Sequence, residues 1–252
     1  MRTLAVIPAR LGATRLPRKP LRLLAGLPLV VRVWQRVSEI GVADRVVIAT
    51  DSDEVAAAAR EHGAEVAMTH SSHPSGTDRV AEVAFRAEFR DFGVVVNVQG
   101  DEPFVSAHAV AGAAGMVTSS RFPLGTAAVA APVDVLRDPH VVKVVTGDDG
   151  HAMYFSRAPI PFLQNERDAD VQRTRVWQHI GVYAYTADAL RQWVALPVHP
   201  LEQIERLEQL RPLAAGLAMG VALIDELVRP GIDTEQDLER ANEQWSAFTT
   251  TG

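Results

Sequence analysis

Short apolar runs rich in β-branched residues alternate with stretches of helical length and periodicity through the first half of this chain. Such alternation predicts βαβ units and a largely parallel sheet with helices on both faces. A continuous apolar run such as Val94–Val98 fits a strand that is buried on both sides. The predicted strands are Thr3–Ile7, Arg45–Thr50, Glu65–Met68 and Val94–Gln99, and the predicted helices are Pro28–Glu39, Asp53–His62 and Asp78–Phe89.

The second half of the sequence is less regular and predicts strands of a mixed sheet. A polar, patternless stretch at Pro159–Arg175 indicates a mobile loop or lid. Leucine and isoleucine recur at three-residue spacing in Leu201–Arg211, which predicts one helix. The last helix should begin at Thr234, which forms a capping-box pattern with Asp237. Further strands are predicted at Thr126–Pro132, Val141–Thr146, Ala152–Phe155 and Ile180–Tyr185, with a hairpin turn at Asp148-Asp149-Gly150.

The composition limits the kind of protein that this chain can be. A net charge of −6 without a basic stripe argues against nucleic acid as the partner, because duplex binding needs clustered positive charge. The absence of cysteine excludes disulfides, thiolate zinc sites and cysteine nucleophiles. No apolar run reaches ~18 residues, so we expect a soluble, cytoplasmic protein without membrane insertion. Because no flexible linker is visible, residues 1–252 are predicted to form a single domain with an inserted subdomain around residues 130–200.

Four basic residues, Arg10, Arg15, Arg18 and Lys19, follow the first predicted strand on one loop. Open α/β sheets bind their ligands at the carboxyl ends of strands. Arginine makes paired contacts to phosphate oxygens and lysine supplies a compact charge, so the loop predicts a triphosphate site. The alternative is a solvated basic turn, and neither a Walker loop nor a Rossmann glycine pattern is present. Lysine occurs only as Lys19 and Lys143, which draws attention to both positions.

Two aspartates in distant segments predict a magnesium site. Asp101 follows the most apolar strand, and Asp233 precedes the last helix. Mg²⁺ is held in proteins by a few carboxylates together with substrate phosphates. A polar turn is the alternative for Asp101, and a helix cap is the alternative for Asp233. The Asp-x-Asp pattern at Asp51-Ser52-Asp53 would suit a glycosyltransferase metal site, but helix capping explains it better.

Three further regions carry polar groups suited to a sugar acid. The segment Ser75–Arg79 places hydroxyls and an arginine at a predicted helix start, where anions bind. The structural alternative for this segment is a capping loop. The second region holds Arg157, His179 and Tyr183, on or beside predicted strands, and the third holds Glu208 and Gln209, in a predicted helix. For His179 in the second region the alternative is a purely structural histidine, and for Glu208 and Gln209 in the third it is a solvated helix face.

From Leu4 to Arg240 the chain resembles the 3-deoxy-manno-octulosonate (KDO) cytidylyltransferase family, because a series of separate motifs occurs in the order typical of that family. The chain departs from the family pattern at Arg18, where glycine is usual, at Gln178, where a basic residue is common, and in Phe162–Val176. The matching motifs are Val6–Arg10, Thr14–Pro17, Lys19–Leu21, Ser75–Arg79, Val96–Pro103, Val142–Val145, Tyr154–Arg157, His179–Tyr183, Pro200–Glu202, Leu207–Arg211 and Gly231–Thr234.

The resemblance implies a nucleotidyltransferase α/β fold, GT-A-like and Rossmann-like, with three layers and a mixed, mostly parallel central sheet. It implies a homodimer and Mg²⁺-dependent cytidylyl transfer from CTP to KDO, which activates KDO for lipopolysaccharide synthesis. The inserted subdomain would serve sugar binding and dimerisation. Lys19, Asp101 and Asp233 would be catalytic, with both aspartates holding the metal. The nucleotide would contact Arg10, Arg15, Lys19, Ser75, Gly76, Thr77 and Gln99, and the sugar would contact Arg79, Gln99, Arg157, His179, Tyr183, Glu208 and Gln209.

Two alternatives to KDO cytidylyl transfer remain open at this point. The sugar could be another keto-acid, such as 8-amino-KDO or sialic acid. The chain could also be a non-catalytic nucleotide-binding protein on the same fold, although the presence of both aspartates and Lys19 argues against this. No side chain stands out as a general base.

Overall fold

The chain divides into two units. Four parallel strands form the sheet of the first unit. The computed structural model describes residues 1–12, 15–226 and 229–249. The first unit comprises Met1–Ala107 and Val228–Gly252, and the second comprises His108–Leu227. The predicted organisation, a single domain with a subdomain around residues 130–200, stays a prediction.

The strands of the first unit follow the order β6, β1, β4, β5, and all neighbours are parallel. Each coincides with one of the predicted apolar runs, and β6 is buried along its whole length, as a strand covered on both faces must be. The bounds are β1 (Thr3–Ala9), β4 (Arg45–Thr50), β5 (Glu65–Met68) and β6 (Val94–Val98).

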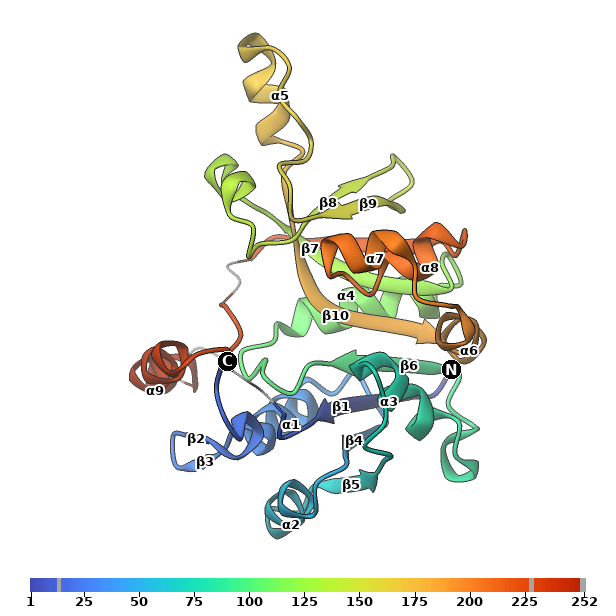
Figure 1. Ribbon diagram of the computed structural model, residues 1–252, viewed down its shortest axis with the longest axis vertical. Helices are drawn as coiled ribbons and strands as arrows, with labels where there is room; N and C mark the ends of the chain where they lie inside the picture. The colour runs from blue at the N-terminus through green and yellow to red at the C-terminus, as the bar shows by residue number, and fades with distance from the viewer. Residues whose placement is uncertain (13–14, 227–228, 250–252) are drawn as a thin grey trace. The chain divides into compact units, whose positions relative to one another are not determined.

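Three helices connect these strands: α1 (Leu29–Ile40), α2 (Asp53–Glu61) and α3 (Gly76–Ala84). Right-handed crossovers require α1 and α2 on one face of the sheet and α3 on the other. Figure 1 shows α1 and α3 on opposite sides of β1. Ser52 caps α2 by accepting a hydrogen bond from the Val55 backbone N–H at 3.3 Å, which confirms capping as the role of this segment.

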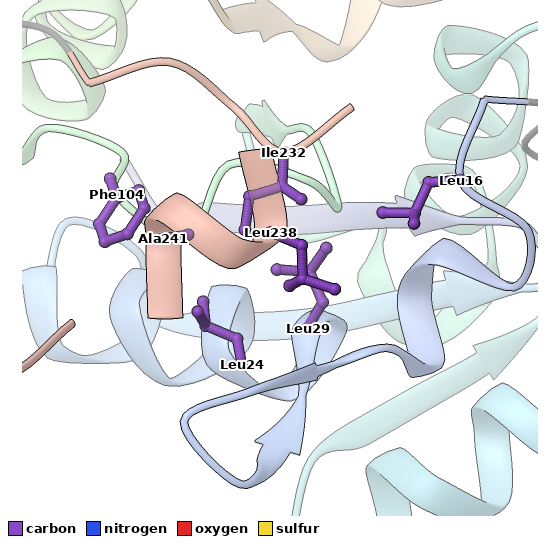
Figure 2. Close-up of a cluster of buried hydrophobic side chains, with 7 residues drawn as sticks. All are labelled: Leu16, Leu24, Leu29, Phe104, Ile232, Leu238 and Ala241. Atoms are coloured by element: carbon purple, nitrogen blue, oxygen red, sulfur yellow. The ribbon is translucent and has the colours of Figure 1, made fainter. Parts of the chain in front are cut away.

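A cluster of buried apolar side chains ties the C-terminal helix to the loops that follow β1 (Figure 2). Its members are Leu16, Leu24, Leu29, Phe104, Ile232, Leu238 and Ala241. Leu16 lies in the predicted phosphate loop and Ile232 directly precedes Asp233, so burying them fixes both segments. The elements involved are the 3₁₀ turn η1 (Lys19–Leu21), the hairpin β2 (Leu23–Leu24) and β3 (Leu27–Pro28), and α9 (Glu235–Thr249). A second 3₁₀ turn of this unit, η2 (Ala87–Phe89), follows α3 and is separate from the cluster.

The second unit holds a mixed set of strands centred on β7 (Leu124–Ala130). The neighbours of β7 are β11 (Met219–Ile224), which is parallel to it, and β10 (Trp177–Thr186), which is antiparallel. Strand β8 (Lys143–Thr146) pairs antiparallel with β10 and with β9 (Ala152–Ser156). The parallel pairs of both units together with these antiparallel ones confirm the predicted α/β class with a mixed, mostly parallel sheet.

The prediction of one helix at Leu201–Arg211 is wrong. The chain forms α7 (Pro200–Glu205) and α8 (Leu210–Ala214), separated by Arg206 in the left-handed region with φ 56°. The buried Glu202 carboxylate accepts hydrogen bonds from Arg211 at 2.6 and 2.7 Å, which pulls the two segments together. Of the residues that looked like one helical stripe, Leu207 and Leu210 are buried, whereas Ile204 is 76% exposed.

The predicted patternless loop at Pro159–Arg175 contains regular structure. It forms η4 (Glu166–Asp168) and α5 (Ala169–Arg173), after a cis peptide bond between Ile160 and Pro161. Its buried Gln172 side chain donates to the Pro161 carbonyl at 2.8 Å, a contact that no local pattern indicates. The mobility of this segment stays a prediction.

Several elements of the second unit have no clear signal in the sequence. Helix α4 (Ala107–Thr118) is apolar almost all round, so it lacks the polar face that marks a surface helix. Helix α6 (Ala187–Ala195), strand β11 and the 3₁₀ turn η3 (Val133–Arg137) were also not predicted. None of the helices in the described residues is both long and apolar enough to cross a bilayer.

Candidate active site

The predicted catalytic residues of the first unit meet at one ammonium group. The Lys19 Nζ lies 2.6 Å from Asp101 Oδ2 and 2.7 Å from Asp233 Oδ1. Burial of Lys19 acts to lower its pKa, but the charges and hydrogen bonds of the two carboxylates outweigh burial and raise it. The structure therefore brings together three residues that are separated by most of the chain, as the sequence-based site requires.

The basic residues around this cluster differ in what they contact. Arg15 donates to the second carboxylate oxygen of Asp233 at 2.9 Å, so Asp233 has two positive partners. Arg10 follows β1 and is exposed, in a position that can reach a solvent-borne ligand. Thr14, which belongs to the same predicted phosphate loop, lies outside the described residues.

Asp233 is not the cap of the last helix. The Thr234 hydroxyl accepts from the Asp237 backbone N–H at 3.2 Å, and the Asp237 carboxylate accepts from the Thr234 backbone N–H at 2.9 Å. This is the predicted capping box, and it satisfies the helix start without the Asp233 side chain. The carboxylate of Asp233 is thereby available to Lys19 and Arg15, so the structural alternative for this residue fails.

A third carboxyl group, that of Glu102, lies beside the two aspartates. A Cβ atom at Gly231 would stand 2.6 Å from Glu102 Oε1 and 3.2 Å from the Asp101 carbonyl oxygen, so only glycine leaves room for this carboxyl. Burial, followed by the charges of Asp101 and Asp233, raises the pKa of Glu102 to about 8, and Lys19 only partly opposes this. Sequence reasoning missed Glu102, because its neighbour Asp101 explains the motif equally well.

We expect Glu102→Gln to stabilise the protein increasingly as the pH rises. The folded-state pKa of about 8 exceeds the ordinary 4.5, so between these values the folded protein binds more protons than the unfolded chain. The resulting stability is full below pH 4.5 and is lost as the pH rises toward 8. Glutamine stays neutral throughout, so the difference in Tm between variant and wild type should grow from pH 5 to pH 9.

The control for this prediction is Glu243→Gln, at an exposed position of α9. Its Tm should follow that of the wild type at every pH. Parallel curves for Glu102→Gln and wild type would mean that the Glu102 carboxyl is already ionised in the folded protein.

The predicted nucleotide residues Ser75, Gly76 and Thr77 form the start of α3. Ser75 caps this helix, and its hydroxyl donates to Asp78 Oδ2 at 2.7 Å. The Cβ position of Gly76 lies 3.5 Å from Pro8 and 3.8 Å from Gln99 Oε1, which places this turn beside the carboxyl ends of β1 and β6. Ser75 is thus a cap as well as a candidate ligand, and its role toward a nucleotide stays a prediction.

Arg79, predicted for the sugar, is buried within the first unit. Its guanidinium contacts Asp51 at 3.4 Å and also the Thr69 hydroxyl. The remaining predicted sugar residues apart from Gln99 belong to the second unit. A pocket shared by all of these residues stays a prediction.

In the second unit, Arg157 lies directly after β9 and is fixed by backbone carbonyls. Its guanidinium donates to Glu205 O and Pro139 O, each at 2.9 Å. The Glu205 carboxylate in turn accepts from the Arg157 backbone N–H at 2.9 Å and from the Ser156 hydroxyl at 2.5 Å. These two contacts use two of the five guanidinium N–H groups.

Lys143 supports the same strand end. It is fully buried, and its ammonium donates to the carbonyls of Asp138, Val141 and Arg157 at 2.9, 2.7 and 2.6 Å. Burial lowers its pKa, yet three acceptors require three N–H donors, which only the charged form supplies. A planar guanidinium does not fit three converging carbonyls, which explains lysine at this position in an arginine-rich chain.

We expect Lys143→Met to destabilise the protein by about 2–4 kcal/mol, because it leaves three partly buried carbonyls without a donor. Urea unfolding followed by circular dichroism measures this difference. Arg175→Met, at an exposed position of the same unit, is the control and should stay within about 0.5 kcal/mol of wild type. Equal stability of both variants would mean that water replaces the ammonium at no cost.

A bulge in β10 brings His179 and Tyr183 together. The pairing with β7 passes from Ile180↔Ala127 to Tyr183↔Thr126, so two residues of β10 have no opposite residue. The rings of His179 and Tyr183 are consequently 5.4 Å apart between centroids. Burial lowers the pKa of His179 to about 3, and burial together with Tyr185 and Glu208 raises that of Tyr183.

Gln209 has the most direct sign of a missing ligand. The residue is 3% exposed, and its side-chain Nε2 has no hydrogen-bond partner in the described part of the chain. Buried amide donors are normally satisfied, and an orphan needs an explanation such as an absent ligand or water. Glu208 precedes Gln209 and raises the pKa of Tyr183, so it lies close enough to share this environment.

Comparison with known proteins identifies the family. The family model described as Cytidylyltransferase matches residues 4–221. A 3-deoxy-manno-octulosonate cytidylyltransferase of Gemmatimonas aurantiaca is 63% identical, with 98% of this chain and 96% of that protein covered. The chain belongs to the 3-deoxy-manno-octulosonate cytidylyltransferase family.

Other members of the family show the same likeness at greater distance. The corresponding enzyme of Actinobacillus pleuropneumoniae serotype 7 is 42% identical over 93% of this chain and 96% of its own. A solved structure of CMP:2-keto-3-deoxy-manno-octonic acid synthetase complexed with CTP superposes with a TM-score of 0.90 at 35% identity, covering 98% of this chain and 99% of the other. The predicted nucleotidyltransferase fold is confirmed.

The backbone geometry before Lys19 suits the glycine that the resemblance leads us to expect there. Arg18, which stands at that position here, has φ 57°, in the left-handed region that glycine enters without strain. Its side chain forms an ion pair with Glu54, which helps to hold the arginine in this conformation. Lys19 therefore starts its 3₁₀ turn in the expected backbone geometry despite the departure.

A divalent cation fits the two aspartates of this family member. Within residues 1–12, 15–226 and 229–249, no group of three His, Asp or Glu side chains is arranged to hold a metal alone. Asp101 and Asp233 nevertheless contact the same nitrogen, at 2.6 and 2.7 Å, so the two carboxylates converge on one position that a cation occupies. Mg²⁺ commonly needs only one or two carboxylates together with substrate phosphates.

Proposed function

We propose that this chain transfers the cytidylyl group of CTP to the anomeric hydroxyl of KDO, giving CMP-KDO and diphosphate, with Mg²⁺ as its cofactor. The observation that carries the proposal is the contact of the Lys19 ammonium with both Asp101 and Asp233. A lysine and two carboxylates from three segments suit a site for a metal triphosphate. The names of the relatives, with identities up to 63% among those compared, support CTP and KDO as the substrates.

The chain's own residues provide binding and charge neutralisation. Arg10 and Arg15 are exposed and can make paired contacts to phosphate oxygens. Lys19 has a flexible stem, so its ammonium can turn from the carboxylates to a phosphate oxygen. Asp101 and Asp233 would hold Mg²⁺, which when bound lowers the pKa of a coordinated hydroxyl and stabilises charge on a phosphoryl group.

The second unit would recognise the sugar. The remaining N–H groups of Arg157 can pair with the carboxylate of KDO, since guanidinium and carboxylate match in geometry. The orphan amide of Gln209 supports a polar ligand beside it. Glu208, His179 and Tyr183 add acceptors and donors suited to hydroxyl groups. On the nucleotide side, the turn Ser75–Thr77 and Gln99 would contact the cytidine of CTP.

Diphosphate release from purified protein tests this proposal. CTP with KDO and Mg²⁺ should release diphosphate, and omission of the sugar, the metal or CTP should stop the release. Parallel reactions with 8-amino-KDO and sialic acid identify the sugar. Faster turnover of 8-amino-KDO or sialic acid would mean that this sugar, and not KDO, is the substrate. No turnover with any of the three sugars would favour a nucleotide-binding protein without catalysis.

We also propose a cytoplasmic homodimer whose product is used in lipopolysaccharide synthesis. Large apolar side chains at Met153, Phe162 and Val171 are exposed on the second unit, which supports a covering partner there. Light scattering after gel filtration would give twice the chain mass of 27.3 kDa for a dimer. A mass equal to one chain at micromolar concentration would contradict the dimer.

A further inference from the structure

The buried hydroxyl of Thr126 contacts three polar groups at the bulge of β10. Its Oγ1 lies 2.7 Å from the Val182 carbonyl oxygen, 3.3 Å from the Ile180 carbonyl oxygen and 2.9 Å from His179 Nε2. Thr126 itself is 0% exposed. A threonine hydroxyl has one hydrogen to donate, so these three contacts cannot all be made by donation from Thr126.

The two carbonyls decide where that hydrogen goes. Carbonyl oxygens only accept, and a second oxygen held at 2.7 Å without a hydrogen between them would be repelled. The bulge also leaves Val182 without an opposite residue in β7, so its carbonyl needs a donor from outside the ladder. The Thr126 hydroxyl therefore donates toward the carbonyls and accepts from His179.

It follows that the Nε2 atom of His179 carries a hydrogen. A neutral imidazole has one N–H and one bare nitrogen, so the hydrogen on Nε2 leaves Nδ1 as the acceptor. Among the described residues, the hydrogen-bonding contact of the His179 ring is the one between Nε2 and Thr126. The ring is further held by Phe155 and Tyr183, whose centroids lie 5.0 and 5.4 Å from its own.

We propose that Thr126 is a positioning residue that fixes His179 as the Nε2–H tautomer, so that Nδ1 accepts a hydrogen bond from a hydroxyl of the bound sugar. This rests on the proposed function for the identity of the ligand. A bare Nδ1 repels a carboxylate, because both groups only accept. His179 thus selects a hydroxyl, and the carboxylate of the sugar acid is left to Arg157.

Nitrogen-15 NMR of the free, uniformly labelled protein tests the tautomer without substrate. Two-bond proton–nitrogen correlations distinguish a protonated ring nitrogen from a bare one in each of the eight histidines. The signals of His179 are assigned by their loss in His179→Gln. We expect Nε2 protonated and Nδ1 bare at pH 7.5. The opposite tautomer, a mixture or a doubly protonated ring would overturn the proposal.

Two variants test the link to the sugar. Thr126→Ser keeps the hydroxyl and should keep both the tautomer and the KM for KDO. Thr126→Val removes the hydroxyl, so we expect a mixture of tautomers and about a tenfold rise in the KM for KDO, with the KM for CTP unchanged. An unchanged KM for KDO in folded Thr126→Val would overturn the sugar contact.

The wild-type spectrum decides the tautomer even if Thr126→Val does not fold, and Thr126→Ala is then the second variant without a hydroxyl, for which we expect the same rise in the KM for KDO. Failure of the proposed function is seen separately, as wild-type protein that does not consume CTP with KDO. In that case the contact between His179 and a sugar hydroxyl is overturned. The tautomer of His179 is still decided by the NMR spectrum of the free protein.

Discussion

Asp101→Asn and Asp233→Asn are each expected to lower kcat at least ~10²-fold while leaving the fold intact. The amide keeps the shape of the carboxylate but can neutralise neither a divalent cation nor the Lys19 ammonium that lies 2.6 and 2.7 Å from these side chains. Steady-state diphosphate release measures the loss of activity. Isothermal titration with Mg²⁺ and a nonhydrolysable CTP analogue should show weaker metal binding in both variants.

Two control variants separate the metal role of these aspartates from helix capping. Thr234→Ala removes the capping hydroxyl and should cost about 1 kcal/mol of stability with kcat nearly unchanged. Asp53→Asn changes an exposed aspartate of the Asp-x-Asp segment and should keep wild-type activity. Full activity in Asp233→Asn, or a severe loss in Asp53→Asn, would move the metal site away from the residues proposed.

Lys19→Arg is expected to lower kcat by ~10²-fold although it preserves the charge. The Lys19 ammonium is a single nitrogen between two carboxylates, and its side chain is 13% exposed. A guanidinium is planar and wider, so it would separate Asp101 from Asp233 or place the phosphates in a different register. A displacement of about 1 Å at a reacting centre is enough for a loss of this size.

Arg22→Lys is the matched control for this substitution. Arg22 lies next to the same 3₁₀ turn and pairs with Glu235 rather than with Asp101 or Asp233. The exchange also conserves charge, so near-normal kcat there would assign the defect of Lys19→Arg to geometry. Wild-type turnover in Lys19→Arg would mean that the site needs only a positive charge, and that lysine occurs at this position by chance.

The sequence by itself determined the parallel strands of the first unit and the loops that carry the site. The observed β4 and β5 begin and end where the apolar runs do, because a buried parallel strand must be apolar on both faces. The capping box at Thr234 is equally local, since its two partners are three residues apart. Ordered motifs were also sufficient to identify the family.

Only the tertiary structure decided what contacts each candidate residue. Lys19 meets Asp101 and Asp233 across 82 and 214 positions of the chain, and no spacing rule connects such residues. The break at Arg206 between α7 and α8 depends on the ion pair of Glu202 and Arg211, which a helical stripe of leucines conceals.

The same reason applies to the residues that sequence reasoning missed or left without a role. Glu102 is unusual because Gly231 gives it space beside two other carboxylates, and Lys143 because three carbonyls converge on it. Thr126 acts at a bulge that exists only in the paired strands. Periodicity and capping record contacts within a few residues, whereas burial, charge and tautomer are set by neighbours that only folding brings together.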